Sequence, residues 1–155
     1  MEGVSTYLSS LSTREAVVDA LYRFVTGLDT SNIELFDSAL TDDATFDLNG
    51  RVMKGLEEIH TYCYDTISKL DTTHFLCNVR VDYKEKETTA NMTATALAHH
   101  YPDAQGTVKD SINFVAGSLY SVHLVRKVND ELWQIDQLTL NVVWSEGDMS
   151  VIMKQ

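Results

Sequence analysis

His74 is the residue of this sequence whose type and position best suit chemistry. It stands where the polar run Asp71-Thr-Thr gives way to an apolar, β-prone run that begins at Phe75. A side chain at such a junction can leave a sheet and enter a pocket. Imidazole titrates near neutral pH, and a carboxylate bonded to one ring nitrogen makes the other a better base. His74 is therefore a candidate general base, and the alternative is a purely structural histidine.

The carboxylate best placed to pair with His74 is that of Asp29. It follows an apolar stripe with steps of three and four residues, the pattern of an amphipathic helix, formed by Val17, Val18, Leu21, Val25 and Leu28. Ser12-Thr-Arg-Glu15 has the pattern of a capping box at the start of this helix. Because Asp29 comes at the end of the stripe, it can face the interior. The alternative is a polar residue that only ends the helix.

His99 and His100 are adjacent on a strand expected from Thr88 to Tyr101, so their side chains face opposite ways. One shares its face with the threonines of this strand, the other with the alanines. Alternation alone does not say which face is concave, so at this point either histidine can enter a pocket. The two cannot reach one ion from a regular strand, and no other His or Cys residues have ligand spacing. We expect no metal and no cofactor.

The remaining patterns predict an α+β fold. Two helices are followed by a hairpin around Asn49-Gly50, a third helix from Leu56 to about Leu70, and four long antiparallel strands. A long twisted sheet must bury one face, and three amphipathic helices can cover it. We expect a curved antiparallel sheet wrapped around three N-terminal helices, with an internal pocket for a small ligand. The expected strands are 75–83, 88–101, 112–128 and 132–144.

Composition limits the location and the partners. The 155 residues include 12 basic and 23 acidic side chains, a net charge of -11. An acidic surface repels phosphate backbones and anionic lipid heads, so we expect neither nucleic acid nor membrane as a partner.

We expect one domain over 1–155, with 1–11 and 147–155 as peripheral tails. Two isolated cysteines and the lack of a signal-peptide pattern predict a cytoplasmic protein, and the sheet's Ala and Val content predicts a homo-oligomer, dimer or trimer.

From about Arg14 to Trp144 the chain resembles the SnoaL-like division of the NTF2-like superfamily. The matching residues are Leu28-Asp29, Thr73-His74-Phe75, Ala98-His99 and the closing hairpin from Arg126-Lys-Val to Leu132-Trp133-Gln-Ile135. Scytalone dehydratase is the nearest well-known relative, with bile-acid dehydratases and a hexachlorocyclohexane dehydrochlorinase further away. The resemblance implies a cone-shaped α+β barrel in which Asp29 pairs with His74. It makes His99 the second pocket histidine, since the interval from His74 fits without a gap.

The chain departs from these relatives at the general acid. Relatives often carry pocket tyrosines where this chain has Leu28 and Leu48. The candidates to replace such a tyrosine are Tyr22, Tyr62, Tyr64, Tyr101 and Tyr120, and the sequence does not choose among them. The residues expected to bind substrate are Tyr22, Tyr64, Tyr101, Tyr120 and Asn141.

Together with these residues, the resemblance implies a cofactor-independent dehydratase, a lyase acting by His–Asp acid–base chemistry. Its substrate would be a small, mostly apolar oxygenated metabolite (polyketide, terpenoid or steroid-like) of secondary metabolism. His74, oriented by Asp29, would remove a proton next to a carbonyl group, and His99 would protonate the departing hydroxyl or polarise the carbonyl oxygen. The alternatives are an isomerase or cyclase with the same dyad, and a non-catalytic NTF2-like module for ligand binding or dimerisation.

Overall fold

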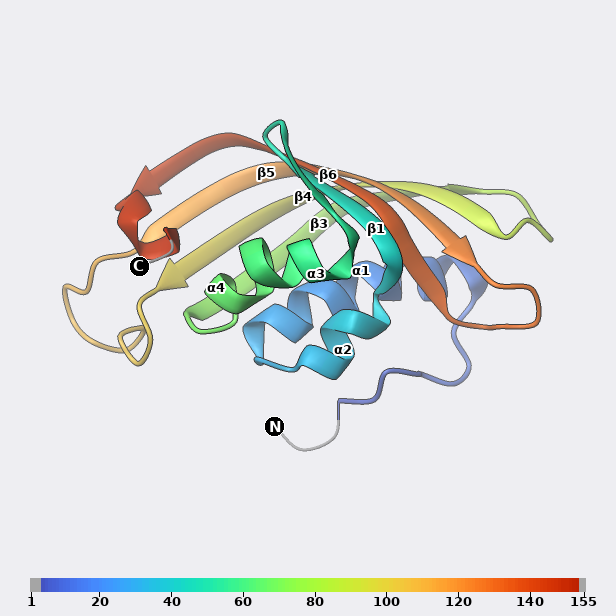
Figure 1. The fold of residues 1–155 in the computed structure, drawn as a ribbon, viewed down its shortest axis with the longest axis horizontal. Coiled ribbons are helices and arrows are strands. Elements are labelled where there is room, and N and C mark those ends of the chain that lie inside the picture. The colour runs from blue at the N-terminus through green and yellow to red at the C-terminus, as the bar shows by residue number, and fades with distance from the viewer. Residues whose placement is uncertain (1–3, 154–155) are drawn as a thin grey trace.

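The computed structural model describes residues 4–153. Six strands form one curved sheet in the order β2-β1-β6-β5-β4-β3, and helices lie against its concave face (Figure 1). This confirms the predicted α+β class and cone shape. The helices are α1 (Thr13–Asp29), α2 (Ile33–Ser38), α3 (Gly55–Ile59), the π-helix η1 (His60–Tyr64), α4 (Asp65–Ile67) and the 3-10 helix η2 (Met149–Ile152). The strands are β1 (Leu40–Leu48), β2 (Arg51–Lys54), β3 (Asp71–Tyr83), β4 (Thr89–Tyr101), β5 (Phe114–Arg126) and β6 (Trp133–Gly147).

The ends of α1 and of the first hairpin follow from local sequence. Ser12 caps α1 by accepting a hydrogen bond from the N–H of Glu15, whose carboxylate accepts one from the N–H of Ser12. This is the predicted capping box. Asn49 and Gly50 both have positive φ, 52° and 89°. A two-residue hairpin turn with two positive φ angles favours asparagine followed by glycine, as predicted.

The sheet is mixed rather than purely antiparallel. Strand β1 pairs in parallel with β6, while the four other strand pairs are antiparallel. The expected antiparallel sheet is corrected here, because the β1–β2 hairpin adds to the free edge of β6 in the same chain direction. Strand β3 also begins earlier than predicted, since Thr72 and Thr73 already pair with β4.

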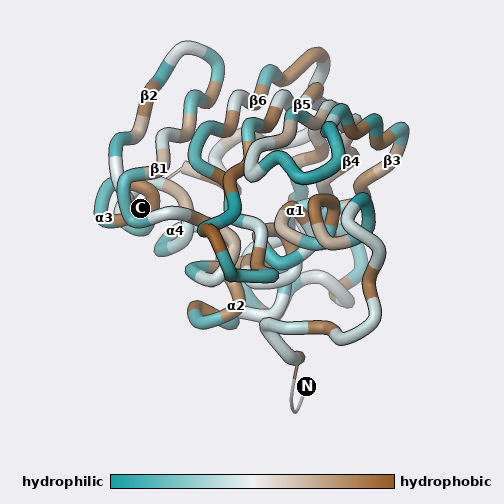
Figure 2. The backbone as a smooth tube through the Cα atoms, turned by 90° about the vertical axis from the view of Figure 1, so that its right-hand side faces the viewer, coloured by the Kyte–Doolittle hydropathy of each residue, from teal (hydrophilic) through white to brown (hydrophobic). Residues whose placement is uncertain are grey.

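Side chains alternate between the two faces of the long strands, and the tube alternates in hydropathy accordingly (Figure 2). On β4 the alanine positions are buried beneath the helices, whereas the threonine positions face outward. Small side chains let the helices approach the concave face closely. Helix α1 packs against β3 and β6 and fills that face with its apolar stripe. The concave face is therefore the one that carries the alanines and His100.

The C-terminal residues, expected as a peripheral tail, close one end of the sheet. We call this the η2 end: β3 and β5 begin there, and β4 and β6 end there. Helix η2 folds back and buries Val151 in a small apolar cluster with Phe114 and Ala116, distinct from the main core. Gly147 allows this turn, because its φ is +94° and a Cβ there would lie 2.1 Å from the carbonyl oxygen of Asn113. At the other terminus, residues 5–10 are exposed. Within residues 4–153 no helix is both long and apolar enough to cross a membrane.

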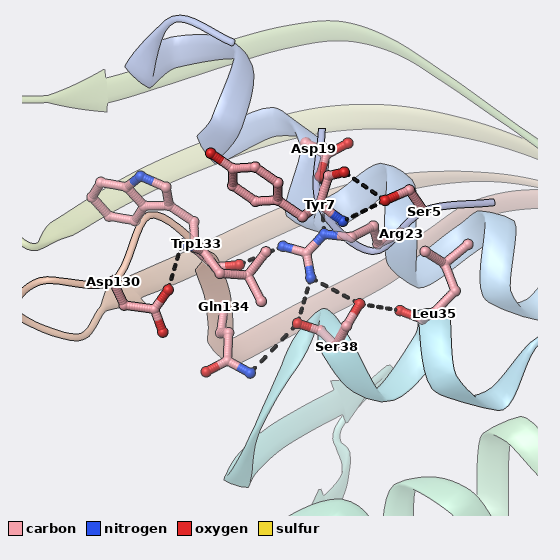
Figure 3. Close-up of polar contacts among 10 residues, drawn as sticks. Ser5, Tyr7, Asp19, Arg23, Leu35, Ser38, Asp130, Trp133 and Gln134 are labelled. Atoms are coloured by element: carbon pink, nitrogen blue, oxygen red, sulfur yellow. Dashed lines mark hydrogen bonds and ion pairs between the residues drawn. The ribbon is translucent and has the colours of Figure 1, made fainter. Parts of the chain in front are cut away.

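Arg23 is a buried cation that ties the helices to the sheet. Its guanidinium group donates hydrogen bonds to the carboxylate of Asp19 (2.9 Å), the hydroxyl of Ser38 (3.0 Å) and the carbonyl oxygen of Trp133 (2.5 Å), as well as to the Ser38 carbonyl (Figure 3). Burial lowers the pKa of Arg23, whereas the hydrogen bond and charge of Asp19 act in the opposite direction. Arginine remains charged nonetheless. The cluster joins α1 to the end of α2 and to the start of β6.

Replacing Arg23 with Ala should lower the free energy of unfolding by about 3 kcal/mol or more, because a carboxylate and two backbone carbonyls lose their buried partner. Urea unfolding followed by circular dichroism measures this change. Arg14→Ala is the control, since the exposed Arg14 donates one bond to the Val81 carbonyl. Its loss should stay below about 1 kcal/mol. Similar losses in both variants would contradict the account of the Arg23 cluster.

Candidate active site

Asp29, the last residue of α1, meets the start of β3 at the η2 end. Its carboxylate accepts hydrogen bonds from the hydroxyl of Thr72 (2.7 Å), the backbone N–H of His74 (2.9 Å) and Nδ1 of His74 (2.6 Å). The side chain of His74 is 7% exposed and that of Asp29 is 18% exposed. Thr72 and His74 both lie within β3 and are two residues apart, so their side chains share one face of the strand. This is the concave face. The structure thus brings together the two residues that the sequence paired.

The protonation of this pair follows from its surroundings. Burial raises the pKa of Asp29, but the hydrogen bonds and charge of His74, with the hydroxyl of Thr72, outweigh it, and the net pKa is lowered. An ionised carboxylate only accepts hydrogen bonds, so Nδ1 of His74 carries the hydrogen. In the neutral imidazole the lone pair then lies on Nε2, the nitrogen that can take a proton.

Two further His–Asp pairs have equally short contacts. His123 Nδ1 lies 2.6 Å from Asp136 on the convex side of the sheet, and His60 Nε2 lies 2.5 Å from Asp37 between η1 and α2. All four of these side chains are a quarter to a third exposed. A short contact alone therefore does not mark a site. His74 differs by its burial and by its backbone bond to the same carboxylate.

His100, rather than His99, shares the concave face with His74. His100 pairs with Thr72 and His99 with Thr73 in the β3–β4 register, and directly paired residues lie on the same face. The rings of His74 and His100 are 5.5 Å apart and nearly perpendicular, at 88°. The expected place of His99 beside His74 is corrected, because the helices cover the alanine face of β4. The sequence indicated this, because His100 has the same strand parity as the alanines of β4, and small side chains suit a face that is covered by helices.

Nδ1 of His100 lies 3.1 Å from the backbone carbonyl oxygen of Phe114. A carbonyl oxygen only accepts, so Nδ1 donates and the lone pair lies on Nε2. Burial lowers the pKa of His100 to about 4, and the nearby His74 acts in the same direction. His100 is therefore neutral at neutral pH.

Several polar atoms on the concave face make no hydrogen bond within the described part of the chain. Within residues 4–153, the fully enclosed polar side-chain atoms that lack a hydrogen bond belong to β1 and to the end of β5. Four other polar atoms also lack a hydrogen-bond partner among the described residues but are not fully enclosed. They are Nε2 of His74, Nε2 of His100 and the hydroxyl groups of Ser118 and Tyr120. All four are hydrogen-bonding groups of the concave face that the folded chain leaves unused.

Two hollows open at the η2 end, and Leu70 lines both of them. The first, about 740 Å³, is lined by Asp29, the start of β3, His99 and Tyr101. The second, about 780 Å³, is lined by Leu70, Ile112, Val151 and Met153, among others. Asp29 lines the first of these hollows, whereas His74 and His100 are not among the residues that line either one. Among residues 4–153 no group of three or more His, Cys, Asp or Glu side chains is placed to hold a metal ion.

Two of the residues expected to bind substrate lie close to this site. Tyr120 is on the concave face, 4% exposed. Burial raises the pKa of Tyr120, and the charges of Cys63 and Asp29 act in the same direction, so its phenol stays protonated. Tyr101 lines the hollow beside Asp29.

The other three lie elsewhere. Tyr64 is buried, but it packs against the ring of Phe36 at 4.9 Å. Tyr22 is 46% exposed on α1, and Asn141 is exposed on the convex face, where it pairs with Leu119. The expected pocket positions of Tyr22 and Asn141 are corrected, because both side chains point away from the concave face.

Residues 9–139 match the SnoaL-like domain. The chain belongs to the SnoaL-like family. It is 46% identical over 145 residues to "Terrestric acid biosynthesis cluster protein E" of Penicillium crustosum, covering 94% of this chain and 92% of that protein. This membership confirms the predicted resemblance.

Two solved structures are similar to this chain in shape at low sequence identity. A protein assigned as a scytalone dehydratase from Novosphingobium aromaticivorans has a TM-score of 0.73 at 17% identity, over 87% of each chain. A hexachlorocyclohexane dehydrochlorinase from Novosphingobium barchaimii has a TM-score of 0.69 at 17% identity, over 92% of this chain and 94% of that one. Both confirm the fold.

His100 should make the SnoaL-like domain less stable in mild acid. Its pKa is about 4 in the folded protein, against 6.5 for a histidine that is not buried. Between these values the unfolded chain binds a proton that the folded chain does not, so the free energy of unfolding falls as the pH falls, by about 3 kcal/mol at most. Denaturant unfolding at a series of pH values measures the slope. It should shrink in His100→Gln and persist in His123→Gln, and an unchanged slope in His100→Gln would contradict the assignment.

Proposed function

We propose that the protein is a cofactor-independent dehydratase of secondary metabolism, with His74 as its base and Asp29 as the residue that orients it. The observation that carries this proposal is the 2.6 Å contact between Nδ1 of the buried His74 and the Asp29 carboxylate. It leaves Nε2 of His74 as the ring nitrogen without a hydrogen-bond partner among the described residues. A positioned imidazole of this kind contributes roughly 100- to 10,000-fold to a proton transfer.

The substrate class is a small, mostly apolar metabolite that carries a carbonyl group and a hydroxyl group on the second carbon from it. Nε2 of His74 takes the proton from the carbon between them, and the electrons of the C–H bond form an enolate. The enolate then expels the hydroxyl group as the C–O bond breaks. The departing oxygen takes a proton and leaves as water, so nothing is oxidised or reduced. Tyr120, a protonated phenol, donates to the carbonyl oxygen, where the enolate charge develops.

The relative from Penicillium crustosum supports the metabolic context, because its name places it in a biosynthesis cluster for an organic acid. Within residues 4–153, both cysteines are free, which supports a reducing location such as the cytoplasm. His99 and Tyr101 line the hollow beside Asp29 and can contact a ligand on its way in.

An isomerase or cyclase with the same base is the alternative. Product mass separates the two, since dehydration removes one water.

His74→Ala should remove base catalysis without unfolding the protein. The probe is the ring opening of a nitrobenzisoxazole, in which a base takes the ring C–H proton, the N–O bond breaks and a coloured phenolate forms. We expect kcat/KM to fall by about 100-fold or more in His74→Ala, and also in Asp29→Asn, which disturbs the orientation of the base. Absorbance of the phenolate measures the rate.

The matched control is His123→Ala, which removes an imidazole with the same 2.6 Å carboxylate contact on the convex side. Its rate should equal that of the unmodified protein. No acceleration by the unmodified protein, or an equal loss in His123→Ala, would contradict the proposed function.

We also propose that two copies pair through the convex face. The register aligns Phe75, Leu97, Gly117 and Trp144 in one row across four strands. Phe75 is 54% exposed and Trp144 48% exposed. The indole of Trp144 lies over Gly117, where a Cβ would be 2.3 Å from it. The row is uncharged, and a chain of net charge -11 can approach its own copy most easily through such a face.

Trp144→Glu should weaken this pairing by about 100-fold, because it replaces the largest apolar side chain of the row with an acid on each copy. Sedimentation equilibrium measures the association constant, which should rise with salt as the acidic copies are screened. Ile33→Glu on α2 is the control, since Ile33 is 45% exposed on the opposite side of the molecule from this face. A monomeric unmodified protein, or equal effects of both variants, would contradict the pairing.

A further inference from the structure

A further hollow lies at the end of the sheet opposite the η2 end, where β5 ends and β6 begins. Its volume is about 310 Å³, at the small end of the range of ligand pockets. The segment before α1, the first turns of α1 and the ends of the two strands form its walls. None of the residues placed in the candidate active site lines it. An inference about this hollow therefore does not depend on the dehydratase function.

Arg126, the last residue of β5, lines this hollow with a guanidinium group whose donors are unused. Its Nε is fully enclosed and makes no hydrogen bond, and no ion pair of the described chain includes it. Arg23, by contrast, uses all three of its side-chain nitrogens within the fold. The enclosed Nε reduces the hydration of the Arg126 cation. A ligand that accepts bonds from its two terminal nitrogens therefore gains more there than at a fully hydrated arginine.

The guanidinium group of Arg126 is also held in place. It lies 5.4 Å from the ring centre of Trp133, a cation–π arrangement. Trp133 is 2% exposed, and its carbonyl oxygen accepts a bond from the buried Arg23. The backbone N–H of Arg126 donates to the carbonyl oxygen of Thr88 (2.8 Å). A planar pair of donors fixed in this way is preorganised, so less entropy is lost when an acceptor binds.

The other residues of the hollow limit the class of ligand. Leu8, Leu11 and Ala16 offer apolar surface beside the cation. Glu131 adds a negative charge, although its carboxylate already accepts a hydrogen bond from the hydroxyl of Tyr7. A doubly charged phosphate would be repelled by this acid and by the net charge of -11. A carboxylate brings one charge and two oxygens that match the spacing of the guanidinium donors.

We propose that this hollow binds a small monocarboxylate with an apolar body. The two terminal nitrogens of Arg126 donate paired hydrogen bonds to the two carboxylate oxygens. The apolar body of the ligand packs against Leu8, Leu11 and Ala16. The protein thus has a second ligand site, at the far end of the sheet from the pair of Asp29 and His74.

The test follows the Nε–H signal of Arg126 and the indole N–H signal of Trp133 in the full chain labelled with nitrogen-15. The probe is benzoate, and benzamide is the neutral probe of the same shape. Benzoate should shift both signals in a saturating titration, and benzamide should bind at least about 10-fold more weakly, because it lacks the charge. The indole signal of Trp144, on the convex face, is the internal control and should stay unchanged.

Arg126→Gln should weaken benzoate binding by about 10-fold or more, because charge-assisted hydrogen bonds are lost. The matched control is Arg51→Gln. Arg51 is exposed on β2, away from this hollow, and its guanidinium also stacks on an aromatic ring, that of Tyr62, at 4.6 Å. Benzoate should bind this variant as tightly as it binds the unmodified protein.

Arg126→Lys keeps the charge beside Trp133 and loses the paired donors. It should remain folded, as urea unfolding will show, and bind benzoate about 3-fold more weakly or worse. Equal binding of benzoate and benzamide, an unchanged affinity in Arg126→Lys, or an equal loss in Arg51→Gln would overturn the proposal. So would the absence of any saturating shift in the unmodified protein, or tighter binding of inorganic phosphate than of benzoate.

Discussion

The carboxylate of Asp29 is the constraint on which the site depends. A partly buried ionised group needs several donors, and Asp29 finds them in Thr72 and in the backbone and ring of His74. All three donors belong to the first residues of β3. The same bonds therefore fix the end of α1 against the edge strand of the sheet, set the strand's starting residue and aim the imidazole. The carboxylate of Asp29 therefore serves both the packing of α1 on β3 and the orientation of His74.

A second imidazole beside this pair gives the site its character. His100 lies 5.5 Å from His74 and is nearly perpendicular to it. Two imidazolium ions this close would repel each other, and burial already disfavours charge on His100. The site consequently holds one imidazole bonded to an ionised carboxylate and a second imidazole that stays neutral. His74 donates to a carboxylate and His100 to a backbone carbonyl, and burial keeps His100 neutral although that carbonyl acts to raise its pKa.

The sequence was sufficient for the parts of the fold that depend on local patterns. The capping box at Ser12, the apolar stripe of α1 and the turn at Asn49-Gly50 all have local causes, and each lies where it was predicted. The pairing of Asp29 with His74 came from family resemblance as well as from position. What could not be predicted depended on which face of a strand the helices cover. Alternation separates His99 from His100 but does not name the concave face.

Other differences have the same origin in long-range packing. Asn141 lies on the convex face because its parity on β6 is set by a bulge in the β5–β6 register, which no short pattern indicates. The C-terminal segment was expected to be peripheral, since its apolar residues have no helical or strand period. It is ordered by burial of Val151 against Phe114, a contact between residues far apart in sequence.

The tautomer of His74 tests the central claim most directly. Nitrogen-15 resonances of labelled histidine distinguish a hydrogen on Nδ1 from one on Nε2. The account predicts that His74 carries its hydrogen on Nδ1 in the unmodified protein. It also predicts that Asp29→Asn brings in the other tautomer, because the amide can donate to Nδ1. A hydrogen on Nε2 of His74 in the unmodified protein, or the same tautomer in both proteins, would contradict a base oriented by Asp29.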